Sequence, residues 1–261
     1  MKTKLCYFLI IATSWTMTSQ DTSLDMSIPL AKIQKVLSSL EGKKGDNAIV
    51  SYTINENTIT QLYKADYGDE LKIMRYTNIA WYRMYDLELN DDDDTSELML
   101  SLDKAAYLEN GYKDSPNNDF SVRNYIVVDI PKNNKDKIKA HFYELQKVAQ
   151  TIAKIGGDGW DIYEKQNNLD TAISKSLIAI KHYPSLNWVQ ANLGLFYWLK
   201  GDIKNSKLYY SEAIRQIVSV QDPDNMEALV KDIYDAQAKY PNITNFPELI
   251  TFLENELLKY E

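Results

Sequence analysis

Apolar residues recur every three or four positions over most of this chain, which is the spacing of a helix with one buried face. The clearest example covers residues 134–155, and a glycine-rich stretch at residues 156–159 ends it. The same spacing predicts a short helix at residues 30–40 and a helical hairpin formed by residues 70–88 and 95–110. The pattern therefore predicts a mainly α protein.

Two stretches before residue 131 have the composition of β-strands. Residues 48–63 contain two runs of apolar and β-branched residues around a polar turn, so they predict a hairpin. A helix that begins near Asp46 is the competing interpretation, because short apolar runs do not decide between the two. Residues 125–130 form an apolar run before Pro131, which predicts another short strand. We therefore expect an α-rich N-terminal segment with a few short strands.

The C-terminal half contains two stretches that match each other at an offset of 34 residues. Tyr163 then falls on Tyr197, and Ala179 falls on Ala213. A period of 34 residues with small and aromatic residues at fixed offsets is typical of a tetratricopeptide repeat. Residues 153–220 therefore resemble the tetratricopeptide repeat (TPR) family, and the chain up to residue 261 is a candidate continuation.

The resemblance implies an α-solenoid, in which antiparallel helix pairs stack side by side. Such packing requires small residues where helices approach, and Gly194 and Ala213 fit this requirement in the second unit. The first unit departs from the pattern, since Trp160 occupies a position that is small in the family. Its glycines favour a short first helix that begins near Asp158. The helices after residue 220 are off the repeat register, and we interpret them as a cap.

In the TPR family, the first helices of successive units line a concave groove that binds a peptide segment. Indole rings in such a groove provide contact area, and charged groups fix the register of the peptide. The alternative is that Trp188 and Trp198 pack against the N-terminal region. Carried over by position, the candidate groove residues are Lys154, Asp161, Glu164, Lys165, Trp188, Leu195, Trp198 and Leu199.

The start of the chain has the features of a secretory signal peptide. Lys2 and Lys4 precede a short apolar run, which is too short to cross a bilayer because that needs about 20 residues. The alternative is an uncleaved, buried helix or strand. We predict a secreted or periplasmic protein with a signal peptide at 1–19, an N-terminal α(+β) region at 20–133 and a TPR-like helical-hairpin domain with a C-terminal cap at 134–261.

Composition and charge exclude several kinds of site and partner. The only cysteine, Cys6, lies within the candidate signal peptide, so the rest of the chain has no disulfide or thiolate metal site. The net charge of −8 repels phosphate backbones, and we expect neither a nucleic-acid partner nor stable membrane insertion. His141 and His182 have no partner at metal-ligand spacing. We therefore predict no metal and no cofactor.

No phosphate-binding loop, GxSxG or HExxH motif is present, so we predict a non-enzymatic scaffold that binds a protein or peptide. The acidic residues at 86–97 have part of the spacing of a calcium loop but lack its central glycine, so we interpret them as a solvated loop. Two alternatives remain. One is a glycan or small-ligand binding module with a Trp-lined groove. The other is a carboxylate hydrolase, for which Asp158 and Asp161 are the candidate acids.

Overall fold

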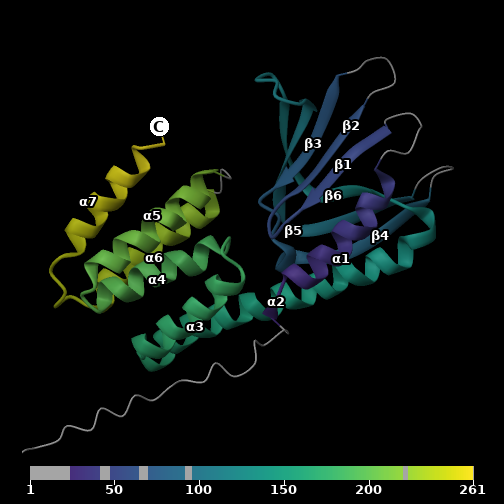
Figure 1. Ribbon diagram of the computed structural model, residues 1–261. Coiled ribbons are helices and arrows are strands. Elements are labelled where there is room, and N and C mark those ends of the chain that lie inside the picture. The colour runs from purple at the N-terminus through teal and green to yellow at the C-terminus, as the bar shows by residue number, and fades with distance from the viewer. Residues whose placement is uncertain (1–23, 42–47, 65–69, 92–95, 220–222, 261) are drawn as a thin grey trace, which may run out of the picture.

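The computed structural model shows two unlike halves that share one long helix (Figure 1). A curled antiparallel sheet belongs to the N-terminal half, and a stack of helices makes up the C-terminal half. Helix α2 (Lys135–Gln166) runs along the sheet and continues into the helical stack. The candidate signal peptide at residues 1–19 lies outside the described part of the chain. The structure describes residues 24–41, 48–64, 70–91, 96–219 and 223–260.

Within the described residues, one helix precedes the strands and six helices follow them. The strands are β1 (Ala48–Ile54), β2 (Ile59–Lys64), β3 (Leu71–Thr77), β4 (Met84–Asp91), β5 (Ser96–Tyr112) and β6 (Asp119–Ile130). The other α-helices are α1 (Ser27–Leu37), α3 (Leu169–His182), α4 (Asn187–Leu199), α5 (Ile203–Ser219), α6 (Pro223–Lys239) and α7 (Phe246–Leu257). Three short 3-10 helices are η2 (Ser38–Leu40), η3 (Trp81–Arg83) and η4 (Lys132–Asn134).

The sheet is organised around β5, its longest strand. β4 pairs with the first half of β5 and β3 with the second half, so β3 and β4 lie end to end along one edge. β6 pairs with β5 along the other edge, and β1 and β2 extend the sheet beyond β3. The pairing of β5 with β6 shifts between Ser101 and Ala106. Such an irregularity bends a strand, which fits the curl of the sheet in Figure 1.

This sheet overturns the predicted helical hairpin at residues 70–88 and 95–110. The first range forms β3, η3 and β4, and the second lies within β5. The predicted fold class, a mainly α solenoid preceded by an α-rich segment, is therefore wrong. The hairpin predicted at residues 48–63 is confirmed as β1 and β2, and the strand predicted at residues 125–130 is the end of β6.

Helices α1 and α2 lie together against the sheet and close its core. Trp81 of η3 is fully buried, and its ring centroid lies 6.0 Å from that of Phe142 on α2. Lys32 of α1 and Glu144 of α2 form an ion pair with Nζ and Oε1 2.7 Å apart. A partly exposed pair of this kind contributes at most about 1 kcal/mol, so apolar burial is the main source of stability here.

Helix α2 is continuous, which contradicts the joint predicted at residues 156–159. Its buried positions recur at alternating steps of four and three residues, through the glycines and beyond. A Cβ on Gly156 would lie 2.7 Å from Val189 Cγ2 of α4, and one on Gly159 would lie 2.9 Å from Ser176 Oγ of α3. These glycines therefore permit close packing of α3 and α4. The buried positions are Ile138, Phe142, Leu145, Ala149, Ile152, Gly156, Gly159 and Tyr163.

The helices that follow α2 are those implied by the repeat resemblance, α3 to α5, and those interpreted as a cap, α6 and α7. Ala179 and Ala213 are fully buried, and the Ser206 hydroxyl on α5 donates a 2.7 Å hydrogen bond to the carbonyl oxygen of Gly194 on α4. Gly201 turns the chain between these two helices with a φ of +78°. Helices α6 and α7 complete the apolar core of this half.

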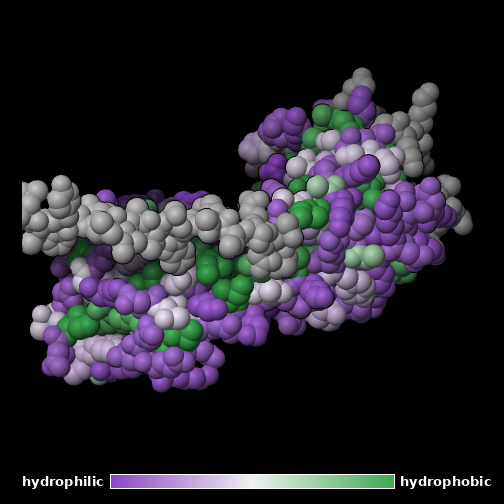
Figure 2. Space-filling model, turned by 60° about the horizontal axis from the view of Figure 1, so that its bottom comes forward, coloured by the Kyte–Doolittle hydropathy of each residue, from purple (hydrophilic) through white to green (hydrophobic). Residues whose placement is uncertain are grey.

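The surface of the described residues is mostly hydrophilic on the face shown in Figure 2, with small apolar patches between polar side chains. This agrees with an acidic chain in which charged residues make up 25% of the sequence. Among the described helices, none combines the length and the apolar character that a bilayer crossing requires.

Candidate functional site

A groove lies between the C-terminal part of α2 and the neighbouring side of α6, and its volume is about 290 Å³. We call it the α2–α6 groove. Trp160, Tyr163 and Glu164 line it from α2, because residues three and four positions apart share one face of a helix. The same rule applies to the opposite wall. The lining residues of α6 are Lys231, Asp232, Asp235, Ala236 and Lys239.

Aromatic rings support the α2 side of the groove. Trp160 and Tyr163 both lie against the buried ring of Phe196 on α4, with centroid distances of 6.0 and 5.1 Å. Tyr240, just after α6, lies 6.5 Å from Tyr163, and its hydroxyl donates a hydrogen bond to Asn167 at the end of α2. Contacts on several sides hold these rings in place, so the groove has a preformed aromatic wall.

The lysines of the groove already have partners. Lys231 Nζ lies 2.6 Å from Asp235 Oδ2, and Lys239 Nζ lies 4.5 Å from the centre of the Tyr163 ring. The second geometry is a cation–π contact. Glu164, in contrast, has neither an ion pair nor a side-chain hydrogen bond among the described residues. The groove therefore has more carboxylate than its own lysines neutralise.

Asp232 is the most perturbed carboxyl group in this groove. Burial removes water from the group and is the main cause that raises the pKa of Asp232 to about 6. The positive charge of Lys231 opposes this shift, and the negative charges of Asp235 and Glu164 add to it. A carboxylate in this position is destabilised at neutral pH, which makes it a candidate for binding a cation.

We expect the Asp232→Asn variant to be about 1 kcal/mol more stable than the natural chain at pH 7, after allowing for partial exposure of the group. The pKa of Asp232 is about 6 in the folded chain against a reference value of 3.8. Between these values the folded chain binds more protons than the unfolded chain, so stability falls as pH rises. Urea unfolding of both chains at several pH values measures the contribution of Asp232 as the difference between their slopes. Equal slopes in the natural chain and the variant contradict the assignment.

The predicted groove residues of the first unit lie along the exposed side of α2. Lys154 forms an ion pair with Asp158, and Asp161 forms one with Lys165, each at 2.9 Å. Glu164 is the member of this set that lines the α2–α6 groove. The structure thus brings one of the four to the site and leaves the others within ion pairs along the helix.

The predicted groove residues of the second unit contribute mainly to the core. Leu195 and Trp198 are each 1% exposed, and Leu199 packs partly buried against the same helical core. Trp188 packs against the core shared by the sheet and α2. The four residues belong to α4, whose inner position between its neighbours buries nearly every side chain.

Sequence reasoning missed the α6 wall because α6 was interpreted only as part of a cap. The signal was present, since Lys231, Asp232, Asp235 and Lys239 recur at helical spacing on one side of α6. If α6 is treated as the first helix of a third helix pair, the predicted groove extends to these residues. Placing them opposite Glu164 requires the packing of α6, which its sequence does not specify.

The candidate acids for hydrolysis do not form a catalytic pair. Asp158 and Asp161 are each ion-paired with a lysine of the same helix, and neither lines the α2–α6 groove. Among the described residues, no three potential metal-ligating side chains come close enough to hold an ion. The groove itself presents an indole ring and charged groups.

Comparisons of this chain with protein-family models, with curated proteins and with solved structures find no match. The resemblance of residues 153–220 to the TPR family therefore stays a prediction. It depends on the 34-residue offset and on the small residues at helix contacts, such as Gly194 and Ala213.

Proposed function

We propose that this protein binds a segment of another protein in the α2–α6 groove and catalyses no reaction. The observation that carries the proposal is the half-buried carboxyl group of Asp232 beside Trp160 in the groove, where burial raises the pKa of Asp232 to about 6. Groups that reduce stability are often retained because they bind a ligand. Membership of the TPR family and export through residues 1–19 are parts of the same proposal.

The groove suits a peptide that presents a lysine or arginine side chain. The methylene stem of such a side chain packs on the partly exposed Trp160, and its charged head reaches the carboxylates of Asp232 and Glu164. Lys239 of the protein itself already has its ammonium group over the Tyr163 ring. A volume of about 290 Å³ is at the lower end of the range for ligand pockets, so it accommodates one or two side chains.

Glycan binding in a Trp-lined groove has less support. Trp198 is buried, Trp188 packs against the sheet core, and one face of Trp160 is covered by Phe196. Stacking on a sugar ring requires an open aromatic face. A hydrolase would need two facing acids, and Asp158 and Asp161 are instead paired with lysines.

Fluorescence polarisation with labelled peptides tests the proposal. We expect peptides with a central lysine or arginine to bind, and matched alanine peptides to bind at least about tenfold more weakly, which is about 1.4 kcal/mol. Asp232→Asn and Glu164→Gln should each weaken binding of the basic peptides. Asp161→Asn, on the exposed side of the same helix, is the control and should leave affinity unchanged. The proposal is rejected if basic and alanine peptides bind with equal affinity, or if neither substitution weakens binding of the basic peptides.

A further inference from the structure

A second cavity lies where the two halves of the molecule meet, and we call it the junction pocket. Its volume is about 250 Å³. Glu56 and Asn57 reach it from the β1–β2 turn and Asn78 from the end of β3, while Ser185 from the α3–α4 loop and Gln216 from α5 form the opposite side. Small-ligand sites occur preferentially at such boundaries between structural units.

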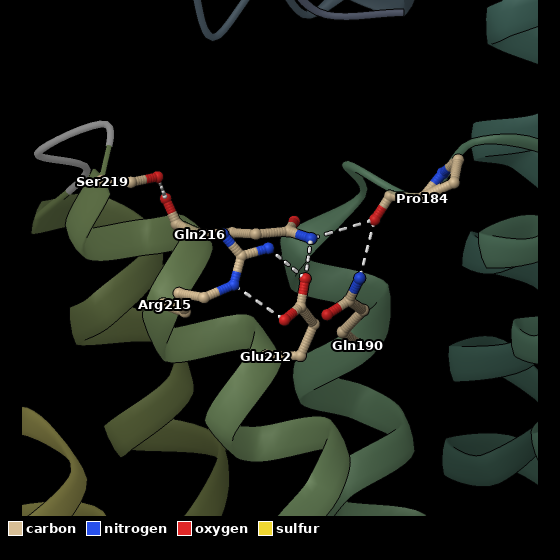
Figure 3. A network of polar contacts seen from close by, with 6 residues as sticks. All are labelled: Pro184, Gln190, Glu212, Arg215, Gln216 and Ser219. Atoms are coloured by element: carbon tan, nitrogen blue, oxygen red, sulfur yellow. Dashed lines mark hydrogen bonds and ion pairs between the residues drawn. The ribbon is translucent and has the colours of Figure 1, made fainter.

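Hydrogen bonds fix the helical side of this pocket, as Figure 3 shows. Gln216 Nε2 donates to the carbonyl oxygen of Pro184 at 3.2 Å and to Glu212 Oε1 at 2.9 Å. Arg215 Nε donates to Glu212 Oε2 at 2.8 Å, so the two charges neutralise each other. Gln190 Nε2 donates to the same Pro184 carbonyl at 2.7 Å. The side chains are therefore arranged before any ligand binds.

Two buried polar atoms at the pocket have no hydrogen-bond partner within the described part of the chain. They are the donor Asn78 Nδ2 and the acceptor Gln216 Oε1. Asn78 also has a positive φ of 57°, and the next residue is fixed by a 2.9 Å hydrogen bond from Ile79 N to the carbonyl oxygen of Asn57. Unpartnered polar atoms at one cavity are a feature of a binding site, and the backbone around Asn78 holds this residue in a defined position.

We propose that the junction pocket binds a small, neutral, polyhydroxylated molecule of about monosaccharide size. Each hydroxyl group can both donate and accept, so neighbouring hydroxyls match the carboxylate of Glu56, the amide of Asn57 and the hydroxyl of Ser185 that line the pocket. A small movement of the Asn78 and Gln216 side chains then brings their buried, unpartnered atoms within reach of the same ligand. The carboxylate of Glu56 has no ion pair among the described residues, so it accepts further hydroxyl donors and repels anions. The volume of about 250 Å³ lies just below the roughly 300 Å³ at which pockets for drug-sized ligands begin.

Binding in this pocket would connect the sheet to the helical half. A ligand that contacts Asn78 and Gln216 bridges a strand end and a helix that are far apart in sequence. Because it binds the folded chain and not the unfolded chain, it should raise the unfolding temperature of the whole protein. The pocket shares no lining residue with the α2–α6 groove, so the two binding activities are separable.

Calorimetric titration of the full chain with a panel of hexoses and pentoses tests the proposal, with free amino acids and inorganic phosphate as other ligand classes. We expect at least one saccharide to bind saturably at millimolar concentration or below and to raise the unfolding temperature. The Asn78→Gly variant should bind it at least about tenfold more weakly. Glycine tolerates the positive φ, so this change removes the amide without straining the backbone.

Asp114→Gly is the matched control, because Asp114 also has a positive φ, of 63°, in the β5–β6 turn. It should leave saccharide binding unchanged, and so should Asp232→Asn in the groove. The proposal is overturned if no saccharide binds, if Asn78→Gly binds as tightly as the natural chain, or if amino acids or phosphate bind this pocket in preference to saccharides.

Discussion

Replacing Gly194 by leucine is expected to lower the free energy of unfolding by about 3 kcal/mol or more, at the upper end of the range for overpacked cores. A Cβ at this position would lie 2.6 Å from two atoms of the Tyr210 ring and 2.9 Å from a third. Tyr210 is 1% exposed, so its ring has no free space into which it can move. Helices α4 and α5 would have to separate.

Gly157→Leu is the matched control for this experiment. Gly157 also lies within a helix, but no atom lies within 4 Å of a Cβ built there. Leucine has a higher helix propensity than glycine, so this variant should be as stable as the natural chain or more stable by up to about 1 kcal/mol. Urea denaturation measures both variants. Equal losses would show that helix conformation, not contact with Tyr210, determines the Gly194 effect.

The helical half was predictable because its apolar spacing, turns and small residues agree with one another. Gly194 and Ala213, the small residues predicted at helix contacts, are both buried within α4 and α5. The glycines of α2 were misinterpreted, since a low helix propensity was given more weight than the regular buried stripe that continues to Tyr163. A glycine on the buried face of a long helix permits a close neighbour, and the stripe was the signal for this.

Strands β3, β4 and β5 were missed because they do not show simple alternation throughout. In β5, Leu98, Leu100 and Leu102 alternate and are buried, but the register shift before Ala106 interrupts the pattern. Apolar residues that happen to lie three or four positions apart in this strand then imitated the buried face of a helix. Across β3, η3 and β4, a short turn of 3-10 helix places Trp81 in the core, and this also imitates helical spacing. Bulges and breaks of this kind depend on tertiary packing.

The groove was only partly predictable for a related reason. Of the four residues predicted on α2, Glu164 lines the α2–α6 groove, and sequence reasoning placed the second wall on α4. Periodicity does not show how many neighbours a helix has, and α4 lies between other helices on several sides. Leu195 and Trp198 are therefore core residues, while α6, at the edge of the stack, provides the accessible wall.

Removing a single hydroxyl group, in Tyr183→Phe, is expected to lower the free energy of unfolding by about 2 kcal/mol. The fully buried Tyr183 hydroxyl donates to the carbonyl oxygen of Ile79 at 3.2 Å and accepts from the Trp81 amide at 3.3 Å. Burial raises the pKa of Tyr183, so the phenol keeps its proton and acts as donor and acceptor together. Phenylalanine would leave both backbone groups buried without a partner.

The effect should be local as well as global, because this hydroxyl joins the end of α3 to the connection between β3 and β4. In hydrogen-exchange measurements, the Trp81 amide should lose protection more than the amides of β6 do. Tyr234→Phe, at an exposed position on α6, is the control and should change stability by less than about 0.5 kcal/mol. If Tyr183→Phe behaves like this control, apolar contacts are sufficient to hold the sheet and the helices together. The polar contact between the halves is then not required.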